Sequence, residues 1–150
     1  MHRQWPTFKV TEHGSRSATW EGPLAPDKRE HLVRVRYGVP IVGHNRTTYD
    51  IQPLVQVIRP KLEFHNDYQL GPIPHVYWTR EEWDLPYLCL FSPELREWSA
   101  DDLIADTTIF WADEWLYFYE GWLVTKKWRG GGRHIVRPDA VEEQIGRPTV

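Results

Sequence analysis

Residues 31–37 have the sequence HLVRVRY, in which valine and tyrosine alternate with leucine and arginine. A period of two in β-branched and aromatic residues is typical of a strand with one buried face. Residues 20–24 (WEGPL) also place apolar residues on one side of an extended segment, and residues 54–59 (LVQVIR) are a short apolar run between two prolines. Because no helical pattern separates these three segments, we expect an antiparallel meander.

The second half of the chain has a different character. Residues 87–91 (YLCLF) lie between prolines and are too short for a helix, so they form a small strand or a packed loop. A long aromatic-rich segment follows, which we expect to be helical from Ser99, its N-cap, to the glycines at 130–132. Gly121 or the pair at 107–108 would divide it into two helices. The predicted fold class is α+β: an antiparallel meander, an irregular cysteine segment and C-terminal helices.

Composition bounds the possible functions. The chain has 150 residues, enough for one domain, and its 41% hydrophobic and 26% charged residues exclude a disordered or fibrous protein. The net charge of -3 argues against general nucleic-acid binding. No signal-peptide pattern opens the sequence, and no run approaches the roughly 20 apolar residues of a membrane span. We therefore expect a cytoplasmic protein without a membrane span.

Proline, glycine and charge divide the chain into three parts. We expect a flexible N-terminal arm at residues 1–18, with a strand candidate at 8–10, a folded domain at 19–128, and a glycine-rich basic tail at 129–150. Histidines and the cysteine occur at no metal-binding spacing, so we expect neither a metal nor a cofactor.

Cys89 is the residue best suited to covalent chemistry, and it is the only cysteine. A cysteine between two leucines is usually a small buried hydrophobic residue. Its irregular segment, however, lies just before the expected helix start at Ser99, whose positive end would favour a thiolate. A disulfide within the chain is impossible, and the local signature of papain-like proteases is absent. Acyl transfer through a cysteine thioester is the remaining covalent chemistry.

The order of these motifs resembles that of the ubiquitin-conjugating enzymes, which carry a modifier's C-terminus as a cysteine thioester. The strand patterns are followed by HVY at 75–77, LCL at 88–90 and WS at 98–99, so the similarity covers about residues 19–125. A closer resemblance is to a bacterial subgroup encoded beside cGAS-like nucleotidyltransferases (CD-NTases) in CBASS anti-phage defence operons. The stretches IADTTIFW at 104–111 and WRGGG at 128–132 are similar to that subgroup.

The resemblance implies a ubiquitin-conjugating-enzyme-like fold and a set of roles. Cys89 would be the catalytic residue, carrying the C-terminus of the nucleotidyltransferase to an unknown acceptor amine. His75 and Tyr77 would shape the cysteine loop, and one of them would hydrogen-bond near the thiol. Three acidic residues could orient an incoming lysine or simply solvate a helix end: Asp101, Asp102 and Asp106.

Two other functions remain open. The family's His-Pro-Asn motif is replaced by residues 75–77, HVY, which lack the asparagine. If this replacement means that the chemistry is lost, the protein is a catalytically inactive scaffold that binds and regulates the nucleotidyltransferase. Alternatively, its nine tryptophans belong to a module that binds a sugar or single-stranded nucleic acid by stacking. We expect Trp98, Trp111 and Trp115 to be core residues, whereas residues 115–119 fit either the core or an interface.

Overall fold

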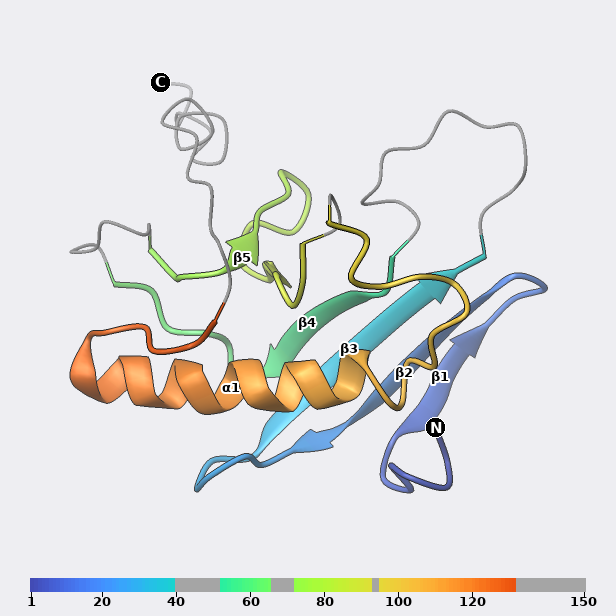
Figure 1. Cartoon of the computed structure of the whole chain (residues 1–150), viewed down its shortest axis with the longest axis horizontal. Helices are drawn as coiled ribbons and strands as arrows, with labels where there is room; N and C mark the ends of the chain where they lie inside the picture. The colour runs from blue at the N-terminus through green and yellow to red at the C-terminus, as the bar shows by residue number, and fades with distance from the viewer. Residues whose placement is uncertain (40–51, 66–71, 93–94, 132–150) are drawn as a thin grey trace.

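A twisted antiparallel sheet carries one long helix across one of its faces (Figure 1). The computed structural model describes residues 1–39, 52–65, 72–92 and 95–131, and in these residues the strands follow the order β1-β2-β3-β4-β6-β5. The elements are β1 (Lys9–His13), β2 (Ser17–Leu24), β3 (His31–Gly38), β4 (Leu54–Arg59), β5 (Val76–Tyr77), β6 (Tyr87–Leu88) and α1 (Thr108–Thr125).

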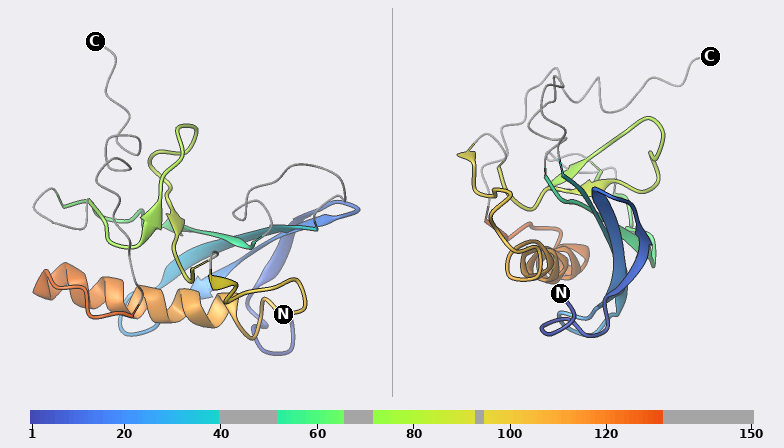
Figure 2. Two further views of the ribbon diagram at one scale, coloured as in Figure 1. Left: turned by 45° about the horizontal axis from the view of Figure 1, so that its top comes forward. Right: turned by 90° about the vertical axis from the view of Figure 1, so that its right-hand side faces the viewer.

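The predicted meander is confirmed. Strands β2 and β3 pair along their whole length, and β3 pairs with β4 so that Val33 lies opposite Val57 and Val35 opposite Val55. These four valines are at most 2% exposed. They face α1, which covers the sheet in both views of Figure 2. The alternation in the strands therefore gives the sheet one buried face, and α1 covers that face, as the α+β class requires.

The structure differs from the prediction of a flexible arm at residues 1–18. Strand β1 lies in this segment and pairs with β2, and the adjoining Phe8 is only 3% exposed. The Phe8 ring packs directly over Gly22, and the Trp5 indole donates a hydrogen bond to the Ala105 carbonyl at 2.9 Å. The strand candidate at 8–10 overlaps the start of β1, but every residue of β1 is solvent-exposed, so no alternating pattern predicted its full length. Most of the predicted tail, residues 129–150, lies outside the described residues.

The helix begins later than predicted. Ser99 does not cap it: residues 98–107 form turns, and α1 starts at Thr108. Trp98 explains the difference, because its ring is buried and its indole donates to the Thr107 hydroxyl at 3.2 Å, which folds the segment back against the start of the helix. The helix ends at Thr125, where Lys126 caps it in the left-handed conformation, rather than at the glycines. In the described residues there is thus one helix where several were expected.

The core lies between α1 and the sheet. The inward residues of α1 are almost completely buried, and Trp98 and Trp115 are buried as predicted, whereas Trp111 is only half-buried. Of residues 115–119, Trp115, Leu116 and Tyr119 belong to the core, whereas Tyr117 is 56% exposed. Within the described residues, no helix combines the length and the hydropathy that crossing a membrane requires.

Candidate active site

The short hairpin β5–β6 places Cys89 at the edge of the sheet. Val76 pairs with Leu88 and Tyr77 with Tyr87, and β6 in turn pairs with β4. The Cys89 amide donates to the His75 carbonyl at 2.9 Å, which extends the hairpin by one residue beyond β6. Cys89 is therefore held by the backbone of a strand pair, and its side chain remains partly accessible.

Tyr77 is the side chain that meets the cysteine. The Tyr77 hydroxyl oxygen lies 2.9 Å from Cys89 Sγ, whereas the Phe91 carbonyl is 3.8 Å from the same sulfur. Tyr77 lies directly opposite Tyr87, so Cys89 is its diagonal neighbour on the same face of the hairpin, within reach of a long aromatic side chain. The thiol donates to the phenol oxygen when neutral, and the phenol donates to the sulfur once the thiolate has formed.

His75 supports the hairpin through its backbone. Its carbonyl accepts the Cys89 amide and also the Trp115 indole, at 3.0 Å, which ties the hairpin to α1. The His75 backbone is left-handed, with φ of 54°, and its buried imidazole stacks on the Trp128 indole with ring centroids 5.0 Å apart. The structure thus brings both predicted support residues to Cys89, Tyr77 by its hydroxyl and His75 by its carbonyl.

The environment of the thiol opposes ionisation. Burial raises the pKa of Cys89, and the negative charge of Glu97 raises it further, while the hydrogen bond from Tyr77 lowers it. Glu97 is held in this segment by the Ser92 amide, which donates to its carboxylate at 2.6 Å. The expectation that a helix N-terminus at Ser99 lowers this pKa is wrong, because α1 begins at Thr108 and no helix starts at Ser99.

The three aspartates lie in the turns between Cys89 and α1, and all are exposed. Asp102 accepts hydrogen bonds from the amide and the hydroxyl of Ser99, at 2.7 and 3.1 Å, and the Asp101 amide donates to the same hydroxyl at 3.3 Å. The Asp106 amide donates to the Leu103 carbonyl. In the described part of the chain no hydrogen bond joins any of the three to Cys89, so their role in orienting an acceptor stays a prediction.

An anchored loop precedes Cys89, and sequence reasoning missed its contacts. Glu82, in the loop between β5 and β6, accepts hydrogen bonds from Arg36 at 3.0 Å, from Gln56 at 3.2 Å and from Tyr87 at 2.6 Å. The Tyr87 hydroxyl and the Arg36 guanidinium lower the pKa of Glu82, and burial raises that of Tyr87 to about 12. The sequence signal for this loop was Gln56, a polar residue inside an apolar strand. Gln56 is only 1% exposed, and a buried polar side chain needs hydrogen-bond partners.

Nearby aromatic rings form the floor of the cysteine segment. Phe91 stacks on Trp98 with centroids 6.5 Å apart and contacts Trp111 of α1 at 5.5 Å, and Tyr37 of β3 meets Trp98 edge-on at 5.4 Å. These contacts attach the segment to both layers of the fold. In the described residues, His, Cys, Asp and Glu side chains form no cluster of three that could hold a metal ion.

A comparison with family models matches residues 1–135 to the family described as the Type II CBASS E2 protein. The chain belongs to the Type II CBASS E2 family. A search of curated proteins finds no match. Membership gives this protein an E2-like role in CBASS, in agreement with the resemblance of its motifs. The match also begins at residue 1, so it includes the N-terminal segment that supplies β1.

Proposed function

We propose that the protein is a cysteine-thioester acyl carrier that conjugates the C-terminus of the CBASS nucleotidyltransferase to an acceptor amine. The observation that carries this proposal is the contact of 2.9 Å between Cys89 Sγ and the Tyr77 hydroxyl at the end of a backbone-bonded hairpin. Family membership supports the class of reaction, and the site supplies the nucleophile with a hydrogen-bonding partner.

In the first step Cys89 Sγ attacks the carbonyl carbon of an activated C-terminal acyl group. The S–C bond forms, the bond to the activating group breaks, and the thiol proton leaves with that group or enters solvent. The thiolate is the reactive form, and the raised pKa of Cys89 keeps it scarce. Tyr77 counteracts this effect by donating its hydroxyl hydrogen to the negative sulfur.

In the second step the acceptor amine attacks the same carbonyl carbon. The C–N bond forms, the C–S bond breaks, the amine releases a proton to solvent, and Cys89 leaves as a thiolate. The Tyr77 hydroxyl stabilises this leaving group as it stabilised the nucleophile. One hydrogen bond therefore serves both steps, because both pass through a partial negative charge on sulfur. Asp101, Asp102 and Asp106 are proposed to orient the amine from the exposed turns ahead of α1.

The thiol's raised pKa, together with the missing asparagine, favours a second candidate, an inactive scaffold that binds the nucleotidyltransferase without acylation. Co-expression of both proteins separates the two candidates. For acyl carriage we expect a covalent adduct on a non-reducing gel that thiol reductant removes and Cys89→Ala abolishes. Cys89→Ser is expected to give an ester that survives reductant, with intact mass identifying the bond. Complex formation without any adduct in the wild type would contradict carriage and support the scaffold.

A further inference from the structure

The outward face of α1 carries a row of exposed side chains. Phe110, Tyr117 and Val124 are 61%, 56% and 82% exposed and follow one another at intervals of seven residues, which places them along one side of the helix. Glu114 and Gly121 fill the positions between them and are also exposed. We call these five residues the outer stripe. Phe110 and Tyr117 are thus two large aromatic side chains exposed on the same side of one helix.

No contact among the described residues requires a glycine at position 121. A glycine inside a helix is destabilising relative to alanine, and it is normally kept where another group approaches closely. A Cβ added at Gly121 would meet no atom within 4 Å, so nothing in the described residues requires its absence. Gly130 differs, because a Cβ there would press on Phe118. The open notch at Gly121, between Tyr117 and Val124, therefore fits a group from outside the chain.

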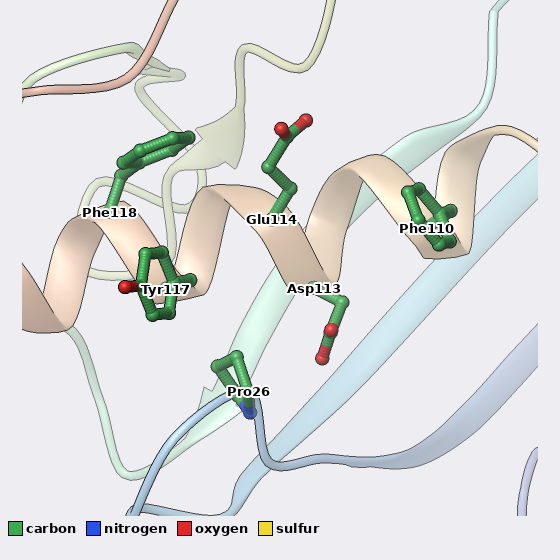
Figure 3. A pocket seen from close by; sticks show the side chains of 6 residues that line it. All are labelled: Pro26, Phe110, Asp113, Glu114, Tyr117 and Phe118. Carbon is green, nitrogen blue, oxygen red and sulfur yellow. The ribbon is translucent and has the colours of Figure 1, made fainter.

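Two carboxylates flank the aromatic part of the outer stripe. Figure 3 shows Asp113 and Tyr117 on the side of α1 next to Pro26, with Glu114 and Phe118 projecting on the other side. In the part of the chain that the structure describes, neither Asp113 nor Glu114 has an ion-pair or hydrogen-bond partner. Burial raises the pKa of Asp113, with a further contribution from Glu120. A cation placed between these carboxylates and over the Tyr117 ring would be attracted by both.

The outer stripe starts beside the candidate active site. Trp111, next to Phe110 in the helix, contacts Phe91 at 5.5 Å, and Phe91 follows Cys89 by two residues. A protein bound along α1 therefore lies within one side-chain layer of the cysteine segment. Such a surface would hold the acyl donor near the thiol without contacting sulfur.

We propose that the outer stripe is the docking surface for a basic, partly apolar segment of the nucleotidyltransferase, with a Lys or Arg side chain between Asp113 and Glu114 and its backbone closest at Gly121. This proposal rests on the proposed function for the identity of the partner. Charge complementarity selects a basic occupant, because Asp113 and Glu114 at the outer stripe have no ion-pair partner in the described residues.

The test measures binding of the purified nucleotidyltransferase in a Cys89→Ala background, where no adduct forms. Gly121→Gln fills the space at Gly121 with a residue of higher helix propensity. We therefore expect the Tm of the isolated protein to rise by about 2–4 °C. We expect Gly121→Gln to weaken binding at least about tenfold, and we expect Tyr117→Ala, as a separate variant, to do the same. Asp113→Asn with Glu114→Gln is expected to weaken binding and flatten its salt dependence. The control Val10→Gln, on the exposed edge strand, should leave binding unchanged.

The other outcomes overturn either the docking surface or acyl carriage, and they distinguish between the two. Unchanged affinity for Gly121→Gln and for the neutralised pair would place the partner elsewhere. A dimer in sedimentation that Gly121→Gln dissociates would assign the stripe to a second copy. Absence of stable binding in the Cys89→Ala background, with adduct still formed by the wild type, would overturn the docking surface while leaving acyl carriage intact. Loss of the adduct with stripe-dependent binding retained would instead reject carriage and keep the surface.

Discussion

The meander β1–β4 and the cysteine segment at residues 72–107 are stabilised in different ways. In the meander, β2 and β3 alone share eight paired positions, and buried valines fill the space beneath α1. In the cysteine segment, strands of two residues are supported by side-chain contacts from Tyr77, Glu82 and Trp98. Substitutions in the first region should therefore change the free energy of unfolding, and substitutions in the second should change the reactivity of one sulfur.

Phe8→Ala should give the largest effect on stability. Phe8 is 3% exposed and packs over Gly22, and removing a buried phenylalanine costs about 3–5 kcal/mol. Urea unfolding followed by tryptophan fluorescence measures this cost. Val10→Ala, on the exposed strand that follows, is the matched control and should change stability by less than about 0.5 kcal/mol. Equal, small effects of both substitutions would mean that residues 1–18 are a mobile arm, and the meander would lose its first strand.

Glu82→Gln should have a smaller effect, at the boundary between the two regions. It removes the charge that accepts hydrogen bonds from Arg36 and Tyr87, and hydrogen bonds to charged groups contribute about 1.5–3 kcal/mol. The pKa of Glu82 is lowered in the folded protein, so its stabilisation is present above the ordinary pKa of 4.5 and is lost as the pH falls through the folded value.

Unfolding free energies measured from pH 7 to pH 3 check this prediction. The difference between wild type and Glu82→Gln should shrink on acidification, because the wild-type carboxylate becomes protonated. Lys61, whose ion pair with Asp84 is exposed, gives a control: Lys61→Met should leave stability nearly unchanged at every pH. A pH-independent difference for Glu82→Gln would show that the loop is held by packing rather than by charge.

Tyr77→Phe should leave stability almost unchanged and alter the thiol. Losing the hydrogen bond to sulfur removes the contact that lowers the pKa of Cys89, so the pKa should rise further. We expect alkylation by iodoacetamide at pH 8 to slow severalfold, because a higher pKa leaves a smaller fraction of the thiol ionised at this pH. Cys89 is the only cysteine, so intact mass reports this reaction without ambiguity. Tyr87→Phe removes a hydroxyl from the same hairpin that does not contact sulfur, and it should leave the alkylation rate unchanged.

Sequence reasoning predicted the elements in which a repeating pattern of apolar residues indicates a buried face. It failed where single side-chain contacts determine the course of the backbone. The alternation at residues 31–37 was sufficient to predict β3 and, with two similar segments, the meander. The strand candidate at 8–10 overlaps β1, but the length of β1 and its pairing with β2 could not be predicted because all its side chains face solvent. The start of α1 was misplaced because Ser99 has the composition of a helix cap but bonds to Asp102 within a turn. That turn depends on where Trp98 is buried, which local sequence does not encode.

The same distinction holds for the candidate active site. Cys89 and its neighbours were found as a motif, and the position of Tyr77 near the thiol follows from strand pairing. The expected electrostatic activation failed, because it relied on the misplaced helix start. Glu97 was missed altogether: it lies eight positions after Cys89 in the sequence, and only the folded turn brings its charge near the sulfur.

Glu97→Gln should therefore give the smallest effect, in the direction opposite to Tyr77→Phe. Glutamine keeps an oxygen that accepts the Ser92 amide, so the segment should retain its conformation while losing the negative charge. Because that charge raises the pKa of Cys89, its removal should lower the pKa and accelerate alkylation by roughly twofold to threefold at pH 8. The pH–rate profile should shift to lower pH without a change in the plateau rate. A faster plateau instead would mean that the substitution opened the segment, and in that case Glu97 would control access to Cys89 rather than its ionisation.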